Sequence, residues 1–491
     1  MWNAPHVEDE FEMKTPVRRF SGSVLSIALA VGVAFAAPAR ADTLADAMAG
    51  AYTRSGLLDQ NRALLRAADE DVASAQALLR PIVNWSASID HTFGNAGSSN
   101  TNIFGITSFN RVSLQDTSTT MGIVAQMLVY DFGASASRIE AAKEVVLATR
   151  ASLLSIEQQV LLRAVSAYMT VRQSYEFVAL RENNQRLLTQ ELRAARDRFE
   201  VGEVTRTDVS LAEAQLASAR SGVAAAKRDL AQAIEFYRNV VGSEPGQLAP
   251  PPGLPRTESN VEKAKAVAMR LHPDLRAAQH QVAANDLLVV ATGRDMYPTV
   301  TLNGGLSVTE NFDNDDFRRA GSVGIEVGGP IYQGGRLSSS NRAAMANRDA
   351  ARSNLHVVQK NLAEGVGNAI ADLQALIAQS QASEQQVRAA SVAFTGVREE
   401  ATLGARTTLD VLDAEQTLLD AQALRIQAQA QVYVAAYAVL ASMGLLTAQQ
   451  LGLNVQIYDP EAYYNMVKTG PAKNTKQGKQ LDRVLKALGK N

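Results

Sequence analysis

The sequence predicts a mixed α + β membrane protein in which long coiled-coil helices alternate with amphipathic strands. Three observations lead to this fold class: an N-terminal export signal, two halves of the chain that repeat one another, and a hydrophobic period that changes within each half. The composition agrees, because aromatic residues make up only 5% of the 491 residues and cysteine is absent. A chain so poor in aromatic side chains favours long helices over a thick globular core.

The N-terminal segment 1–41 has the three parts of a signal peptide. Basic residues precede an apolar run over 24–37, and the Ala-Arg-Ala sequence that follows is typical of a cleavage site. A membrane anchor is the alternative, but a spanning helix needs about 20 apolar residues and this run is shorter. We expect a mature chain that begins at Asp42. Because the extreme N-terminus is acidic, we expect translation to start at Met13.

The mature chain is a duplication. The segment 129–133 (Val-Tyr-Asp-Phe-Gly) returns at 331–335 (Ile-Tyr-Gln-Gly-Gly), and the turn at 201–209 returns at 403–411, both at an offset of 202 residues. Pro81 and Pro298 form another matched pair, at an offset of 217. The two halves therefore differ in length within the loops between these points, where insertions are tolerated.

These matches divide the mature chain into two repeats and a tail. Repeat 1 covers 42–250 and repeat 2 covers 257–453, with a proline-rich linker between them, and a basic C-terminal tail at 454–491 is expected to be solvated. Each repeat is expected to hold a helix, a strand pair, a long helix and a return helix. In repeat 1 the last three cover about 81–131, 135–200 and 205–240, and in repeat 2 about 298–333, 336–401 and 407–443.

The strands are predicted from strict alternation of apolar and polar residues. It begins after Pro81 and again after Pro298, with polar loops expected at 94–100 and 309–319. Alternating segments of about ten residues match the length of a tilted strand that crosses a bilayer. No apolar run long enough for a transmembrane helix follows Ala41. Four strands cannot close a barrel, and lipid does not tolerate open sheet edges, so several chains must combine.

The helices are predicted from length and heptad spacing. Between 135 and 200 there is neither proline nor glycine, which allows one helix of ~100 Å at 1.5 Å per residue. In the return helix, alanines recur every seven residues, which lets coiled-coil helices approach closely. They are Ala212, Ala219, Ala226 and Ala233 in repeat 1, and Ala414, Ala421, Ala428 and Ala435 in repeat 2.

Several function classes are excluded by composition and spacing. With 48 Lys+Arg against 50 Asp+Glu, no global positive charge indicates a nucleic-acid partner. The five histidines show no metal-ligand spacing, and the absence of cysteine removes thiol catalysis. No nucleophile–base arrangement and no phosphate-binding glycine loop is recognisable. We expect no enzymatic activity, no cofactor and no bound metal.

Four sequence features together resemble the TolC family of outer-membrane efflux and secretion channels, in its non-lipidated branch. They are the Thr-Leu-Ala-Asp-Ala start at 43–47, the Pro-Ile-Tyr-Gln-Gly-Gly-Arg corner at 330–336, the two Gly-x-x-Thr-x-x-Asp-Val turns, and Leu-Asp-Ala-Glu at 412–415. The resemblance covers nearly the whole mature chain.

The resemblance implies an architecture and a role. It implies a homotrimer in the cell outer membrane, with four strands per protomer completing a 12-stranded barrel above a periplasmic helical tube. Such a channel is the exit duct of a tripartite efflux pump or a type I secretion system. A periplasmic adaptor and an inner-membrane pump, such as an ABC or RND transporter, open it at the helical tip. The resemblance does not distinguish between drugs and secreted proteins as the cargo.

An exported trimeric coiled-coil structural protein or adhesin is the main alternative. It would explain the heptads and the export signal. It would not explain amphipathic strands that recur at matched places in both repeats.

The two turns between the long and return helices carry the candidate site residues. Their glycines suit the left-handed position that follows a helix, and each Thr-x-x-Asp suits a capping box at the start of the next helix. By resemblance, these turns are also the tips that contact the adaptor. The residues concerned are Gly202 and Thr205 in repeat 1, and Gly404 and Thr407 in repeat 2.

Charged residues in and beside these turns are the candidates for a periplasmic gate. By resemblance, Asp208 and Arg406 would link neighbouring helices, and Asp410 and Asp413 would form an acidic ring that narrows the lumen. Val204 stands in repeat 1 where Arg406 stands in repeat 2, so the network is not symmetric.

Overall fold

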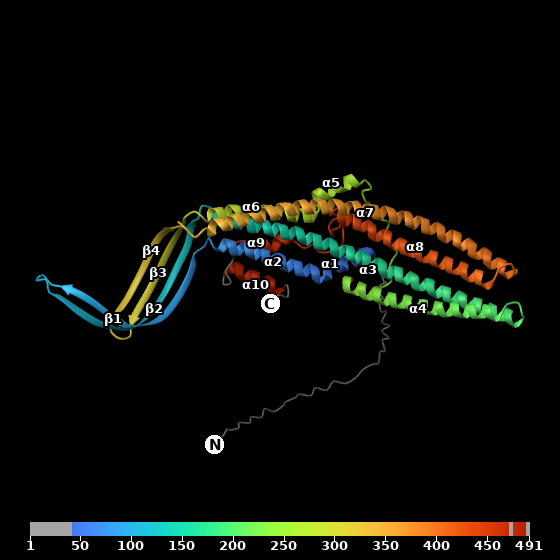
Figure 1. Ribbon diagram of the computed structural model, residues 1–491, viewed down its shortest axis with the longest axis horizontal. Helices are drawn as coiled ribbons and strands as arrows, with labels where there is room; N and C mark the ends of the chain where they lie inside the picture. The colour runs from blue at the N-terminus through green and yellow to red at the C-terminus, as the bar shows by residue number, and fades with distance from the viewer. Residues whose placement is uncertain (1–41, 471–474, 488–491) are drawn as a thin grey trace, which may run out of the picture. The chain divides into compact units, whose positions relative to one another are not determined.

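The computed structural model describes residues 42–470 and 475–487, so the predicted signal peptide at 1–41 lies outside the described residues. The order of elements is the same in both repeats (Figure 1). Repeat 1 consists of α1 (Leu44–Arg54), α2 (Gly56–Ala77), β1 (Ile82–Thr101), β2 (Thr107–Tyr130), α3 (Ala134–Glu200) and α4 (Arg206–Val241). Repeat 2 consists of α5 (Val261–Leu271), α6 (Pro273–Arg294), β3 (Thr299–Asn311), β4 (Phe317–Gly328), α7 (Arg336–Thr402) and α8 (Thr408–Ser442).

The first helical segment of each repeat is broken into two helices, whereas the sequence predicts one. Ser55 caps α2, with its hydroxyl oxygen accepting from the Leu58 N–H at 3.3 Å. His272 caps α6, with Nδ1 accepting from the Asp274 N–H at 3.2 Å, and Pro273 follows as the first helical residue. A polar N-cap and a proline at the first helical position are both helix-start signals.

The four strands form one antiparallel sheet in the order β1-β2-β3-β4. Pairing of β2 with β3 joins the two repeats, but it ends at Ser118 opposite Asn311, whereas β1 and β2 stay paired as far as Thr101 opposite Thr107. The outer part of the β1–β2 hairpin is therefore a two-stranded ribbon. The loop predicted at 94–100 is wrong, because these residues belong to β1. They are small or polar on both faces, which leaves no alternation to indicate a strand.

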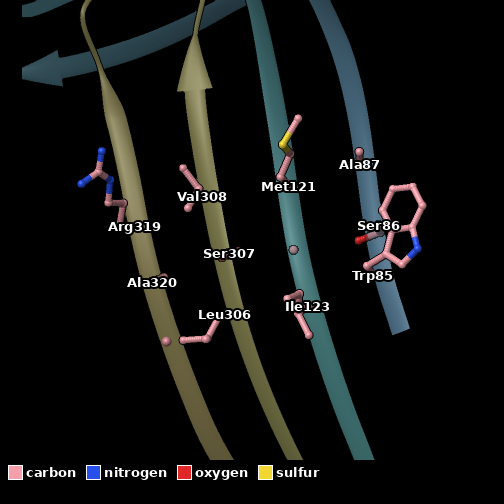
Figure 2. A pocket seen from close by; sticks show the side chains of 12 residues that line it. Trp85, Ser86, Ala87, Met121, Ile123, Leu306, Ser307, Val308, Arg319 and Ala320 are labelled. Carbon is pink, nitrogen blue, oxygen red and sulfur yellow. The ribbon is translucent and has the colours of Figure 1, made fainter. Parts of the chain in front are cut away.

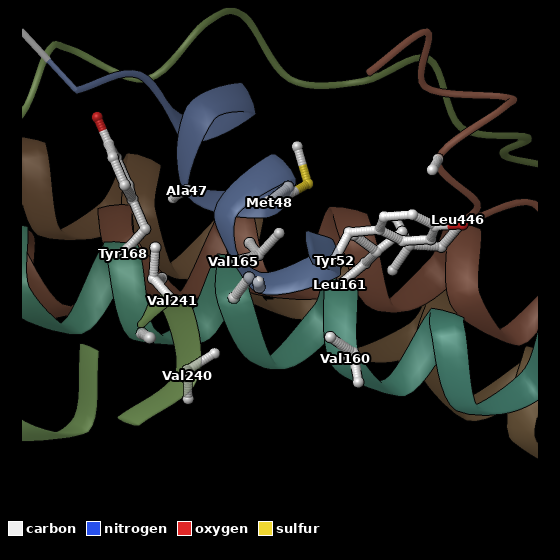
Figure 3. Packing of buried hydrophobic residues seen from close by; sticks show 14 of the residues in the cluster. Ala47, Met48, Tyr52, Val160, Leu161, Val165, Tyr168, Val240, Val241 and Leu446 are labelled. Carbon is white, nitrogen blue, oxygen red and sulfur yellow. The ribbon is translucent and has the colours of Figure 1, made fainter. Parts of the chain in front are cut away.

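The long helices pack along one another. α3 contacts α2, α4, α6 and α8, and α7 contacts α6 and α8. Of the eight alanines predicted at the helix seam, Ala414 is half-buried and the other seven are buried: Ala212, Ala219, Ala226, Ala233, Ala421, Ala428 and Ala435. The largest core lies where α1 covers α3. Figure 3 shows Met48 and Tyr52 of α1 beside Leu161 and Val165 of α3.

Within the described part of the chain, α3 has an 18-residue window that is long and apolar enough to cross a membrane, and 39% of that window is buried. The sequence predicts no such segment, because no apolar run of sufficient length follows Ala41. The window is weak evidence for a span, because a helix that packs inside a protein passes the same test. In α3 the apolar side chains Leu161 and Val165 belong to the core under α1.

The C-terminal segment is only partly solvated. Its helix α9 (Pro460–Val467) packs on α2, where the Tyr463 hydroxyl donates to Glu70 Oε1 at 2.7 Å. Arg80, just before β1, donates to the Gly470 carbonyl at 2.8 Å. A further helix, α10 (Lys476–Ala487), follows. Lys468, Lys476, Lys479 and Lys486 are exposed, as expected for a solvated basic tail, whereas α9 itself packs on α2. Lys473 and Lys490 lie outside the described residues.

Candidate functional site

The sheet has one apolar face. Residues opposite one another in neighbouring strands share a face, so Trp85, Ile123 and Leu306 lie in one row and Met121 and Val308 in the next. Together with Arg319 and Ala320 of β4, these side chains line a shallow hollow of about 690 Å³ across the four strands (Figure 2). Trp85 is 80% exposed and Leu306 is 67% exposed. So much exposed apolar surface on a sheet requires a non-aqueous neighbour.

The opposite face is polar. Ser307 and Thr309 lie on it, and the hydroxyl oxygens of Thr120 and Thr309 are 3.1 Å apart across the β2–β3 pair. Asn303 donates to Glu326 Oε2 at 2.9 Å across the β3–β4 pair. A sheet that is apolar outside and polar inside is the pattern of a transmembrane barrel around an aqueous lumen.

The candidate tip residues at the other end of the long helices act as helix caps. Gly202 and Gly404 have φ of +82° and +76°, a backbone conformation that favours glycine. The Thr205 N–H and hydroxyl both donate to Asp208 Oδ2, at 2.9 and 2.7 Å. Thr407 makes the same two bonds to Asp410, at 3.0 and 2.8 Å. The predicted capping boxes are confirmed, with Asp in place of the usual Glu.

The capping bonds keep both aspartates ionised. Hydrogen bonds from the hydroxyl and the backbone N–H of Thr205 lower the pKa of Asp208 below its usual range. The backbone N–H and hydroxyl of Thr407 do the same to the pKa of Asp410. Asp410 is half-buried and Asp413 is exposed. Each hairpin tip therefore carries fixed negative charge at neutral pH.

A groove of about 830 Å³ separates the α3/α4 hairpin from the α7/α8 hairpin, and both Asp208 and Arg406 line it. Arg406 is exposed, and its Nε donates to Glu400 Oε2 at 2.8 Å within its own hairpin. Glu400 and then Asp410 raise the pKa of the Arg406 guanidinium. In the described residues of one protomer, no hydrogen bond or ion pair joins Asp208 to Arg406. Asp410 and Asp413 lie outside the lining of this groove.

Other polar contacts join the two hairpins. Asn184 of α3 donates to Glu415 Oε1 of α8 at 2.7 Å. Arg398 of α7 pairs with Glu191 of α3 at 3.2 Å. Between α4 and α8, the side-chain amides of Gln215 and Gln416 are 3.5 Å apart. The sequence does not identify these contacts as site features. Although Glu415 closes the Leu-Asp-Ala-Glu motif, its partner lies more than 200 residues away and local spacing cannot reveal it.

An apolar contact accompanies these polar ones. Leu412 of α8 is 5% exposed and packs in the seam of the other hairpin, between α3 and α4. Its neighbours there are Leu188, Leu192, Ala195, Ala212, Leu216 and Ala219. Within the ranges that the structure describes, no group of three or more His, Asp or Glu side chains is placed to hold a metal ion.

A barrel-forming sheet on long paired helices defines an outer-membrane channel-tunnel. Similarity to known proteins identifies its family. Residues 51–243 and 267–445 match the family model described as outer membrane efflux protein. The chain is 35% identical to the outer membrane efflux protein BepC of Brucella suis over 432 residues, which cover 88% of this chain and 91% of BepC. The protein therefore belongs to the outer membrane efflux protein family, a family of channel proteins.

More distant relatives agree. The outer membrane protein TolC of Escherichia coli K12 is 24% identical over 320 residues, which cover 60% of this chain and 63% of TolC. The crystal structure of the Campylobacter jejuni CmeC outer membrane channel has the same fold, with a TM-score of 0.72 at 15% identity, over 87% of this chain and 89% of that one.

Family membership fixes the location and the role. The protein is a channel of the outer membrane with a periplasmic helical tunnel, and it serves as an exit duct for efflux or secretion. The fold is that of a trimer, in which the four strands of each protomer contribute to a common barrel. Channels of this family work with adaptors and inner-membrane pumps. The alternative of a coiled-coil structural protein or adhesin is not favoured.

Proposed function

We propose that this duct is closed at its hairpin end and opens when the α3/α4 and α7/α8 hairpins separate. The observation that carries the proposal is the groove between the hairpins, which a few polar contacts bridge. The partly exposed pair of Arg398 with Glu191 is weak in water. The remaining contacts involve only a few side chains, Leu412 and Glu415 among them. A partner that binds the tips can therefore separate the hairpins without unfolding the helices.

The tips are the surface that we assign to the adaptor. Gly202 with Thr205, and Gly404 with Thr407, form two similar turns at the ends of the hairpins. One adaptor element repeated around the trimer can bind both turns, because their backbone geometry is the same. The inner-membrane partner is a pump of the ABC or RND type, and the nature of the pump decides the cargo.

The charged residues of the tips have two proposed roles. Arg406 and Asp208, on opposite sides of the groove, hold the hairpins through their opposite charges. Three copies each of Asp410 and Asp413 form an acidic ring that disfavours anions in the lumen. The lowered pKa of Asp410 supports this role, because a ring carboxylate must stay ionised.

The proposal is tested by single-channel recording of the trimer in planar bilayers. Arg406→Ala removes the positive charge that shares the groove with Asp208, so closed-state conductance is expected to rise several-fold. Arg220→Ala, at an exposed position on α4, is the matched control and should leave conductance unchanged. Equal closed-state conductance in wild type and Arg406→Ala would remove Arg406 as a latch.

A further inference from the structure

Glu415 is a buried carboxyl group in the contact between the two hairpins. It lies seven residues after the first residue of α8, and only 5% of its surface is exposed. Oε1 accepts a hydrogen bond from Asn184 at 2.7 Å. Oε2 is buried and has no hydrogen-bond partner among the residues that the structure describes. A buried carboxylate with one neutral donor is costly, because most of its hydration is lost and not replaced.

Among the residues that the structure describes, no counter-ion of its own compensates Glu415. On α3, Asn184 and Glu191 face it, and on α7 Arg398 does so, but Arg398 is paired with Glu191 at 3.2 Å. From α4 comes the neutral contact of Gln215 with Gln416. Burial first, and then the charge of Glu191, raise the pKa of Glu415 to about 7, against the opposing effects of Asn184 and Arg398.

We propose that Glu415 is a positioning residue that holds the hairpins together in its protonated form and favours their separation when it ionises. The protonated carboxyl packs in the contact without a buried charge, and its oxygen still accepts from Asn184. Once the hairpins separate, water solvates the carboxylate. This inference rests on the proposed opening of the channel between the hairpins.

The direction of the pH effect follows from the two states. In the packed state the pKa of Glu415 is about 7, and in a solvated state it returns towards its ordinary value of 4.5. The packed state therefore binds the proton more tightly, and opening releases it. Below about pH 4.5 both states are protonated and pH has no effect through this group. Between pH 4.5 and pH 7, each rise of one pH unit increases the equilibrium constant for opening by up to about tenfold per protomer.

The test is the open probability of the full trimer in planar bilayers, measured from pH 5 to pH 8. The wild type is expected to open more often as the pH rises. Glu415→Gln has the size of the protonated side chain and can keep the Asn184 contact, so it should stay closed at every pH. Glu364→Gln, on an exposed position of α7, is the matched control and should retain the wild-type pH dependence. An unaltered pH dependence in Glu415→Gln would overturn the proposal, as would a wild type without one.

A cross-link separates this outcome from failure of the proposed function. The chain has no cysteine, so Gln215→Cys with Gln416→Cys introduces one pair per protomer that a short reducible cross-linker can bridge across the hairpins. The bridged protein should stay closed, and reduction should restore opening. If bridging leaves the open probability unchanged, the hairpins do not separate and the proposed function fails. If bridging closes the channel while Glu415→Gln keeps the pH dependence, only the role of Glu415 fails.

Discussion

Two kinds of carboxylate in this protein have a shifted pKa: those held by a helix cap, and those buried without a hydrogen-bond partner. Asp208 belongs to the first kind and Asp69 to the second. Asp69 on α2 is fully buried, and neither of its carboxylate oxygens has a hydrogen-bond partner in the described part of the chain. Burial raises the pKa of Asp69 to about 6, with Arg150 opposing the shift and Glu70 adding to it. The ionised form therefore destabilises the packing of α2.

Asp69→Asn is expected to stabilise the protein at neutral pH and to have little effect in acid. The folded state resists ionisation of Asp69, so wild-type stability falls as the pH rises from about 4 to 6 and is constant above that range. At pH 7.5, Asp69→Asn is expected to raise the free energy of unfolding by at most about 3 kcal/mol. Thermal unfolding followed by circular dichroism at pH 4 and pH 7.5 measures it. An equal shift in melting temperature at both pH values would contradict the role of ionisation.

At this scale, sequence spacing predicts what is local. The capping roles of Thr205 and Thr407 depend on residues three positions apart, so the sequence reveals them. The burial of Asp69 and the pairing of Asn184 with Glu415 depend on which helices meet. That information is spread over hundreds of residues.

The helices are held together by small residues at a regular spacing. Ala226 on α4 is 8% exposed, whereas its neighbour Ala225 is exposed. Heptad spacing predicts this difference because it identifies the face that each residue occupies. Spacing does not predict the breaks at Ser55 and His272, because the helical pattern continues on both sides of each cap.

Ala226→Leu is expected to destabilise the helical hairpin by about 1–3 kcal/mol, because the larger side chain has no space between α3 and α4. Ala225→Leu adds the same side chain one position away, on an exposed surface, and should have little effect. The temperature at which the trimer dissociates on a gel compares the two. A larger loss for Ala225→Leu would mean that the exposed face of α4 is also packed in the trimer.

The whole molecule depends on a sheet that one chain cannot close. Successive side chains along each strand point to the apolar and the polar face in turn, as Leu306 and Ser307 do. Strand alternation in the sequence predicts both faces, and the requirement for several chains follows from the unpaired edges of β1 and β4. The number three depends on family resemblance, because the sequence contains no physical measure of barrel size.

Leu306→Lys is expected to impair assembly of the trimer, and Ser307→Lys is expected to change its ion selectivity. Lysine at Leu306 faces lipid and costs about 2–4 kcal/mol per protomer near the bilayer centre, so fewer trimers should assemble. Lysine at Ser307 faces the lumen, so the trimer should assemble and its preference for cations should fall. Heat-modifiable gel migration reports assembly, and reversal potentials in a salt gradient report selectivity. Normal assembly of Leu306→Lys would mean that the two faces are assigned the wrong way round.

The long β1–β2 ribbon makes the exterior part of this channel independent of the diameter of its pore. Strand number, tilt and stagger determine the width of a barrel, and only strands paired on both sides take part. Beyond Ser118, β2 no longer pairs with β3, so the ribbon contributes nothing to the pore diameter. Opposed residues of the ribbon can be removed in pairs, or an epitope inserted at its tip, without a change in the register of the pore. The cell-exterior end of this channel can thus diversify or carry a label while the conduit beneath it stays the same.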